Sequence, residues 1–191
     1  LRARARVHAA AGAAHVQVLV NHGRAAGASI AHPHAQLLAL EFVPPAVTAA
    51  LERFAAAGRD VVMDDAEASV AQGGRVLTED ALAWCPFAAA SPFETRITSP
   101  HATARFEDTP DDALDAVARA TRDIVRALTR LLGGAAYNVV VHNGPAQGDV
   151  PFHWYVTVVP RISVVAGFEM GTGVLVNTLD PAEAAARLRD A

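Results

Sequence analysis

Residues 21–36 read NHGRAAGASIAHPHAQ and separate two apolar segments, residues 15–20 and 37–42. The first segment alternates apolar and polar residues and the second is a short apolar run, so both predict β-strands. The stretch between them is rich in small residues and ends in two histidines. It therefore predicts a strand, a glycine-containing loop and a second strand that begins with histidine.

The histidines carry the clearest chemical signal. His32, His34 and Gln36 are spaced two apart, so on a strand their side chains share one face. Pro33 restricts its own backbone and that of His32, which stiffens the segment between the two imidazoles. A neutral imidazole could attack phosphorus while loop amides and an amide side chain hold the oxygens. A turn with exposed histidines and a metal site are the alternatives.

The remaining chain alternates helices and short strands. Residues 109–134 predict the longest helix, with Thr109 as its cap, Pro110 at the first helical position and Gly133-Gly134 at its end. Asp180 and Pro181 open a last helix. Further helices are expected at residues 1–12 and 46–57, residues 59–74 are a helix or a loop, and strands are expected at residues 75–78, 81–85, 93–98, 136–142, 153–159 and 171–176.

The composition argues against membrane and nucleic-acid-binding proteins. Hydrophobic residues make up 52% of the 191 residues, yet no apolar run approaches the roughly 20 needed to cross a bilayer. The net charge of -4 gives no basic surface for nucleic acid. The single cysteine, Cys85, excludes an internal disulfide, and no signal peptide is recognisable. We expect a cytoplasmic protein, and because it has no lysine, phosphate must be held by Arg, His or neutral donors.

One sequence pattern occurs twice in the chain and bears on the fold. The segment VLVNHG at residues 18–23, followed by a loop and a histidine-bearing strand, is similar to VVVHNG at residues 139–144, which is followed by a loop and His153. Two halves with one strand-loop-strand plan are therefore expected. Together with the antiparallel-looking strand pairs, this predicts an α+β fold.

Residues 21–36 resemble, without gaps, the signature of galactose-1-phosphate uridylyltransferases, a branch of the histidine-triad superfamily. Further motifs follow in that family's order. They lie at residues 86–87, 91–95, 100–101, 137–145, 153–154, 160–161 and 166–169. Residues 171–173 and 181–189 look more like the nucleoside-diphosphate-sugar phosphorylase branch. The resemblance implies an antiparallel histidine-triad-like sheet with helices, in which residues 1–80 form the C-terminal part of a truncated first half and residues 81–191 the second half.

The resemblance also implies a two-step reaction. His34 would attack the α-phosphorus of a nucleoside-diphosphate sugar such as UDP-glucose, and the nucleotidyl-histidine would pass its group to a sugar 1-phosphate, as in galactose metabolism. The backbone at His32 would orient the His34 ring, and Gln36 would hold a phosphoryl oxygen. Glu169 would bind a sugar hydroxyl in the neighbouring subunit of a homodimer. The other substrate-binding positions implied are Asn21, Gly27, Ala28, Ser29 and Gly167.

At the positions of that family's metal ligands, this sequence differs from the family. Its structural zinc uses a CxxC and a histidine that this sequence lacks, together with the position of His32, so zinc is an open expectation resting on His32 alone. A second metal is not expected, because only His142 matches a ligand, while Ala50, Tyr155 and Thr157 stand at the other positions. His153 and His101, like His142, are expected to be structural, bonded to backbone groups at strand ends.

Three alternatives to the sugar 1-phosphate transferase stay open. A phosphorylase would use inorganic phosphate as the acceptor, and Ser163, which stands where the family has a lysine near the sugar, keeps it in view. A non-catalytic remnant would bind nucleotides without turnover. A hydrolase is disfavoured, since Gln36 replaces the histidine that serves in proton transfer in hydrolytic relatives.

Overall fold

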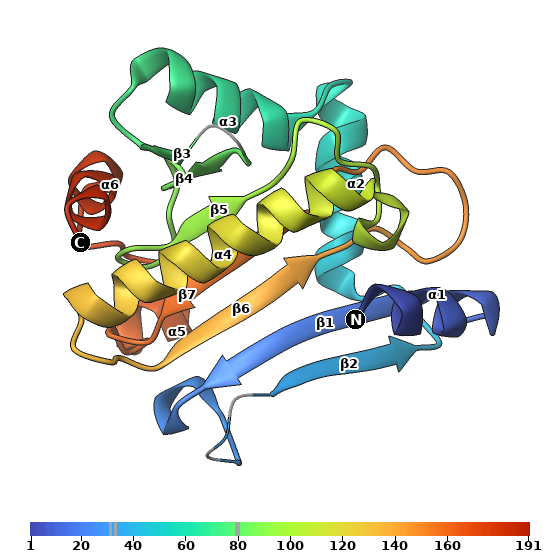
Figure 1. Cartoon of the computed structure of the whole chain (residues 1–191), viewed down its shortest axis with the longest axis horizontal. Helices are drawn as coiled ribbons and strands as arrows, with labels where there is room; N and C mark the ends of the chain where they lie inside the picture. The colour runs from blue at the N-terminus through green and yellow to red at the C-terminus, as the bar shows by residue number, and fades with distance from the viewer. Residues whose placement is uncertain (31, 33, 79–80) are drawn as a thin grey trace.

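The computed structural model describes residues 1–30, 32, 34–78 and 81–191, and its centre is a seven-stranded sheet with the order β2-β1-β6-β7-β5-β4-β3 (Figure 1). All neighbouring strands are antiparallel, and helices cover the sheet, so the predicted α+β fold is confirmed. The strands are β1 (His15–His22), β2 (Ala35–Leu40), β3 (Val76–Thr78), β4 (Ala83–Trp84), β5 (Thr95–Ile97), β6 (Tyr137–His142) and β7 (Tyr155–Pro160).

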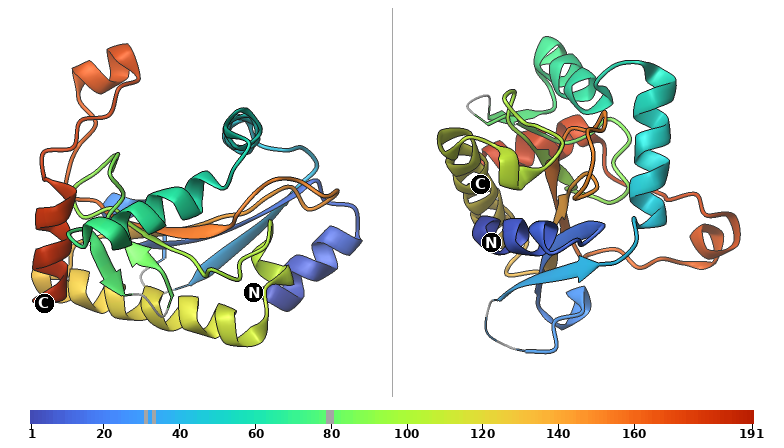
Figure 2. Two further views of the ribbon diagram at one scale, coloured as in Figure 1. Left: turned by 90° about the horizontal axis from the view of Figure 1, so that it is seen from above. Right: turned by 90° about the vertical axis from the view of Figure 1, so that its right-hand side faces the viewer.

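The helices lie on both faces of the sheet. The long helix α4 runs along one face, while α2 and α3 lie on the other (Figure 2). Among the described residues, none of the helices combines the length and the hydrophobicity that a membrane span requires. The helices are α1 (Arg2–Ala10), α2 (Pro45–Ala57), α3 (Val61–Gln72), α4 (Asp111–Leu131), α5 (Gly167–Thr172) and α6 (Pro181–Arg189), with short 3₁₀ turns η1 (Arg24–Ala26) and η2 (Phe106–Asp108).

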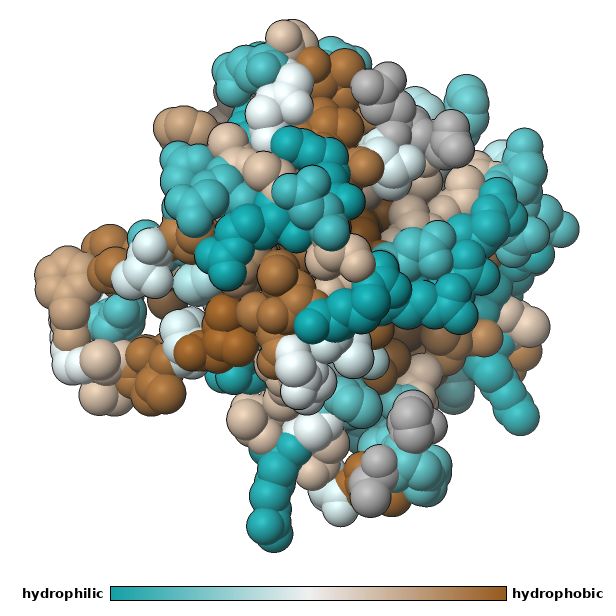
Figure 3. Space-filling model, turned by 60° about the vertical axis from the view of Figure 1, so that its left-hand side comes forward, coloured by the Kyte–Doolittle hydropathy of each residue, from teal (hydrophilic) through white to brown (hydrophobic). Residues whose placement is uncertain are grey.

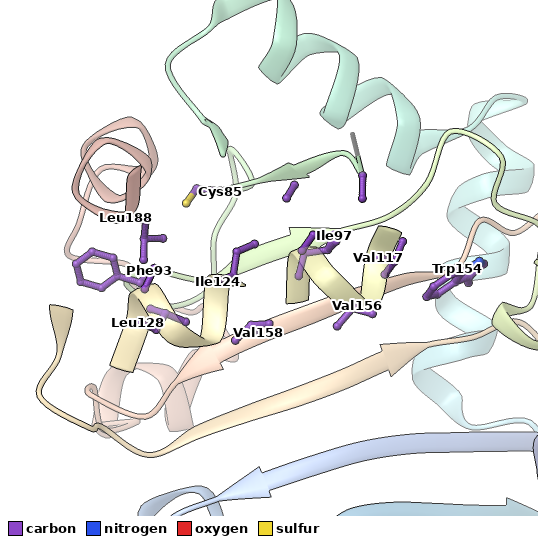
Figure 4. Close-up of a cluster of buried hydrophobic side chains, with 14 of the residues drawn as sticks. Cys85, Phe93, Ile97, Val117, Ile124, Leu128, Trp154, Val156, Val158 and Leu188 are labelled. Carbon is purple, nitrogen blue, oxygen red and sulfur yellow. The ribbon is translucent and has the colours of Figure 1, made fainter. Parts of the chain in front are cut away.

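The main core lies between α4 and the sheet. Val117, Ile124 and Leu128 of α4 are buried against Val156 and Val158 of β7 (Figure 4). Their spacing along α4 places them on one face of the helix. Burying each such side chain contributes about 1.5–3 kcal/mol, so this layer fixes the position of β7 and, through it, of β6 and β1.

The start of α4 differs by one residue from the prediction. Pro110, rather than Thr109, is the capping residue, and the helix begins at Asp111. The Thr109 hydroxyl instead accepts a hydrogen bond from the indole Nε1 of buried Trp154, at 2.7 Å. This bond satisfies the only polar atom of the Trp154 side chain, which explains how the indole is tolerated in the core.

Two other regions settle or correct sequence expectations. Residues 59–74, for which the sequence allows a helix or a loop, contain α3, whose first amides donate to the Asp60 carboxylate. The strand predicted at residues 171–176 is wrong. Residues 167–172 form α5, because the Glu169 carboxylate accepts from the Ala166 amide (3.0 Å), and Gly173 ends the helix with a positive φ of 72°. The segment also projects away from the sheet, so no strand is available to pair with it (Figure 2).

The two strand-loop-strand units lie side by side. β1 pairs with β2 and β6 pairs with β7, and β1 and β6 are neighbours in the sheet. The predicted boundary between residues 1–80 and 81–191 falls at residues 79–80, which lie outside the described residues. That division stays a prediction.

Candidate active site

His34 lies at the entry to β2, half-buried, and its ring is oriented by the backbone. Its Nδ1 lies 3.1 Å from the carbonyl oxygen of His32. A carbonyl oxygen can only accept, so this contact is a hydrogen bond when Nδ1 carries the proton. The other nitrogen, Nε2, then has a free lone pair. The stiffening expected from Pro33 concerns a residue outside the described residues.

Gln36 and Asn21 face the same side of the sheet. Gln36 of β2 is directly opposite Leu19 of β1, and directly opposite residues project to the same face. Asn21 follows Leu19 by two residues on the same strand, so its side chain also projects to that face. Gln36 is exposed. The amide side chains of Gln36, on β2, and Asn21, on β1, thus project to the same face of the sheet, next to the start of β2 where His34 lies.

The loop after β1 depends on Gly23. Its backbone adopts φ 82° and ψ 157°, a region that is essentially restricted to glycine. A Cβ at this position would lie 2.7 Å from the Cβ of Ala136, which precedes β6. Gly23 therefore allows the loop to turn tightly against the neighbouring strand.

The loop amides are used within the loop. Gly27 donates to the Arg24 carbonyl (3.0 Å) and Ala28 donates to the Gly23 carbonyl (3.2 Å). In this conformation the Gly27 and Ala28 amides shape the loop rather than point to a ligand. Ser29 is exposed, and its hydroxyl makes no hydrogen bond to another described residue. Its role in holding phosphate remains a prediction.

One neighbour of the site, Asn138 on β6, was not singled out from the sequence. Its Nδ2 donates to Asn21 Oδ1 (2.7 Å) and to the carbonyl oxygen of Ala26 (2.9 Å). Beside this pair, His22 stacks on Tyr137 with ring centroids 4.7 Å apart. Only the pairing of β1 with β6 brings these residues together. That pairing joins residues more than 100 positions apart, which short motifs do not reveal.

An aromatic stack occupies the positions at which a second metal would need its ligands. His142 stacks on Tyr155 with ring centroids 4.4 Å apart, and the Arg96 guanidinium lies 5.5 Å from the centroid of the Tyr155 ring. Burial, aided by the charge of Arg96, lowers the pKa of His142 to about 4. His142 is therefore a neutral packing residue near pH 7.

The residues present do not by themselves form a zinc site. His32 is exposed, and its ring centroid is 5.8 Å from that of His34. Within residues 1–30, 32, 34–78 and 81–191, no three His, Cys, Asp or Glu side chains are grouped in a way that could hold a metal. Cys85 is buried in the core, and burial raises the pKa of its thiol to about 12, which disfavours the thiolate that zinc requires.

Glu169 and Gly167 lie on a projecting arm. This arm is the segment between β7 and α6, residues 161–180, which includes α5 and extends from the body of the molecule (Figures 2 and 3). It exposes large apolar side chains, including Val164 (89% exposed), Phe168 (57%) and Met170 (74%). The Glu169 carboxylate accepts from the amide of Ala166 on the same arm. That Glu169 binds a sugar hydroxyl in the site of a neighbouring subunit stays a prediction, because it depends on a second copy of the chain.

His153 is bonded to side chains, rather than to the backbone groups expected from the sequence. Its Nδ1 lies 2.6 Å from Asp60 Oδ2, and its Nε2 lies 2.8 Å from Thr98 Oγ1, which in turn donates to the Trp154 carbonyl at 2.7 Å. Burial alone would raise the pKa of Asp60, but hydrogen bonds from His153 and from the amides of Met63 and Val62 outweigh it and lower the pKa. This network ties the start of α3 to β5 and β7.

Comparison with known proteins decides the family. Residues 4–191 match the sequence family described as a domain of unknown function, DUF4921. The chain belongs to the DUF4921 family. Since the match spans nearly the whole sequence, the strands and the loop described above all lie within this DUF4921 domain.

Proteins similar to the DUF4921 chain include a phosphorylase and a probable uridylyltransferase. ADP-glucose phosphorylase of Arabidopsis thaliana is 29% identical over 185 residues, covering 92% of this chain and 52% of that protein. A probable galactose-1-phosphate uridylyltransferase of Drosophila melanogaster is 28% identical over 194 residues, covering 92% and 55%. The DUF4921 chain thus spans about half the length of these relatives.

Solved structures agree with the sequence comparison. The structure of an ADP-glucose phosphorylase from Arabidopsis thaliana with bound ADP-glucose is similar with a TM-score of 0.85 and 28% identity, covering 100% of the DUF4921 chain and 64% of that chain. A uridylyltransferase structure has the same fold, with a TM-score of 0.85 and 23% identity, covering 99% and 66%. The predicted resemblance to galactose-1-phosphate uridylyltransferase-like proteins is confirmed.

Proposed function

We propose that the DUF4921 chain carries the nucleophile of a nucleotidyltransferase, in which His34 receives a nucleoside monophosphate from a nucleoside-diphosphate sugar. The observation that supports this most strongly is the contact between His34 Nδ1 and the His32 carbonyl, because it leaves Nε2 as the attacking atom. The similarity to an ADP-glucose phosphorylase and to a probable galactose-1-phosphate uridylyltransferase supports the class of donor.

The first step balances without any proton transfer. The Nε2 lone pair forms a bond to the α-phosphorus, the bond from that phosphorus to the bridging oxygen breaks, and the sugar 1-phosphate leaves with the electron pair. The imidazole becomes cationic while its Nδ1–H still faces the His32 carbonyl, so that hydrogen bond strengthens as charge develops. A phosphate leaving group needs no general acid. Gln36, which cannot titrate, is thus suited to hold a phosphoryl oxygen.

The second step returns the imidazole to its neutral form. A phosphate oxygen of the acceptor attacks the same phosphorus and the phosphorus–nitrogen bond breaks. With a sugar 1-phosphate as acceptor, a new nucleoside-diphosphate sugar forms, and the enzyme is a hexose-1-phosphate uridylyltransferase-like protein. In this proposal the exposed arm docks on a second copy and brings Glu169 to a sugar hydroxyl. Zinc binding at His32 would need ligands other than a cluster of the described His, Cys, Asp and Glu side chains.

Inorganic phosphate is the second candidate acceptor. The observation that favours it is the 29% identity to ADP-glucose phosphorylase over 92% of the chain. With phosphate, the same intermediate would yield a nucleoside diphosphate, and the reaction would be a phosphorolysis. The two candidates share the first step, so they differ only in what removes the nucleotide from His34.

The first step is tested by intact-mass spectrometry after incubation with UDP-glucose or ADP-glucose. We expect the mass to rise by one nucleoside monophosphate, in an adduct labile to acid, and the rise to be absent in His34→Ala. His101→Ala is the matched control, because His101 is exposed and lies outside the site. No adduct with either donor, in a folded protein, would favour a nucleotide-binding remnant.

The acceptor is identified by a chase of the isolated adduct. Galactose 1-phosphate, glucose 1-phosphate and inorganic phosphate are added separately, and the mass and the released nucleotide are followed. Loss of the adduct with a sugar 1-phosphate supports the transferase, whereas loss with inorganic phosphate alone supports the phosphorylase. Equal loss in buffer would indicate hydrolysis and contradict both.

A further inference from the structure

Asn138 has a bonding pattern that fixes the direction of a neighbouring amide. Its Nδ2 contacts two acceptors at once, Asn21 Oδ1 at 2.7 Å and the Ala26 carbonyl oxygen at 2.9 Å. The Ala26 carbonyl is a backbone group, so it can only accept. The Asn138 atom that faces it must therefore be the nitrogen, and the side chain cannot be turned over without losing this bond.

The orientation passes from Asn138 to Asn21. Because the nitrogen of Asn138 also faces Asn21, the Asn21 atom that meets it must be the oxygen. The Asn21 nitrogen then points to the opposite side, where it lies 4.0 Å from the place that a Cβ on Gly27 would take. Asn21 thus presents N–H groups, rather than an oxygen, toward the glycine-containing loop.

We propose that Asn138 is a positioning residue that makes Asn21 a hydrogen-bond donor to a phosphoryl oxygen of the nucleotide. This inference rests on the proposed function for its ligand. If Asn21 were free to turn over, it would present a carbonyl-type oxygen to an anion about as easily as an N–H, and half of its orientations would repel the ligand. The bond from Asn138 to Ala26 also ties the 3₁₀ turn to β6, so the loop and Asn21 are held together.

Replacement by aspartate tests the direction of the amide. A carboxylate at position 138 would repel the Ala26 carbonyl and accept from Asn21, which would turn the Asn21 oxygen toward the ligand. We expect Asn138→Asp to slow formation of the His34 adduct by on the order of 100-fold, the effect of losing one donor to a developing anion. Asn138→Ala should slow formation of the His34 adduct less, because it leaves the Asn21 side chain free to turn rather than held with its oxygen toward the ligand.

A double-mutant cycle separates positioning from structural support. If Asn138 acts through Asn21, then Asn138→Asp added to Asn21→Ala should slow the adduct no further than Asn21→Ala alone. Gln147→Glu is the matched control, because Gln147 also donates to two backbone carbonyls, of Ala9 and Ala13, at a distance from the site. It should leave the rate unchanged. Multiplicative losses in the double variant would overturn the proposal.

A second measurement does not depend on activity. In a ¹⁵N-labelled protein, the side-chain amide protons of Asn138 should exchange slowly with solvent, since both are hydrogen-bonded, whereas those of Asn21 should exchange fast. On addition of ADP or UDP, the Asn21 signal should be the one that moves. Protected Asn21 protons with freely exchanging Asn138 protons would refute the assigned orientation even if the His34 adduct forms. A native protein that gives no adduct would refute the proposed function without affecting this result.

Discussion

Replacing Gly23, which shapes the loop of the candidate site, by alanine should strongly lower the free energy of unfolding. In Gly23→Ala the backbone would have to keep φ 82° and ψ 157°, which costs a residue with a side chain about 1–3 kcal/mol. The new Cβ would also lie 2.7 Å from the Ala136 Cβ and 3.2 Å from its Cα, and such overpacking costs about 1–3 kcal/mol. We expect a loss of about 4 kcal/mol in the free energy of unfolding, measured in urea by the fluorescence of Trp84 and Trp154.

Two further variants separate the causes of that loss. Gly58 also has a positive φ, 63°, but its ψ of 20° places it in the left-handed region that other residues can adopt, and the space around a new Cβ is open. Gly58→Ala should therefore cost only about 1 kcal/mol, the strain of the left-handed backbone alone. Ala136→Gly, combined with Gly23→Ala, removes the closest clash and should restore part of the stability. If Gly23→Ala were no more destabilising than Gly58→Ala, the close approach of the loop to β6 would be disproved.

Three other perturbations follow from buried groups. Burial lowers the pKa of His142 to about 4, against 6.5 in the unfolded chain, so the free energy of unfolding should fall as the pH drops through this window. Between about pH 8 and pH 5 we expect urea titrations to show a loss on the order of 2 kcal/mol. His142→Phe keeps the stack on Tyr155 and should not show this loss. Thr98→Val leaves His153 Nε2 and the Trp154 carbonyl without their partner and should cost about 2–3 kcal/mol of unfolding free energy in the same assay; a neutral effect would count against the network. Cys85, whose pKa burial raises to about 12, should resist iodoacetamide in the native protein and react only on unfolding, and fast native labelling would contradict its burial.

The sequence predicts the fold wherever a local pattern carries the information. The apolar periodicity of residues 114–131 corresponds to α4, whose buried residues lie on one face of the helix, and the alternation in residues 15–20 corresponds to β1. The strand predicted at residues 171–176 fails for a non-local reason. Its residues favour an extended backbone, but the segment lies on an arm without a neighbouring strand.

The candidate site is predictable only along one segment. Residues 21–36 contain His34, Gln36 and Asn21, and the structure places the two amides on one face of adjacent strands. Asn138 could not be found in the same way, since its role depends on the pairing of β1 with β6. The loop amides of Gly27 and Ala28 also depart from the simple expectation, because a tight turn uses them internally.

The nitrogen that bears the nucleotide is the most direct test of the central claim. The adduct would be prepared with ¹⁵N-histidine-labelled protein, and one-bond coupling between ³¹P and ¹⁵N would identify the ring nitrogen, with peptide mapping to locate the residue. We predict attachment to Nε2 of His34, because Nδ1 is committed to the His32 carbonyl at 3.1 Å. Attachment to Nδ1, or to any other histidine, would contradict the account of how this site works.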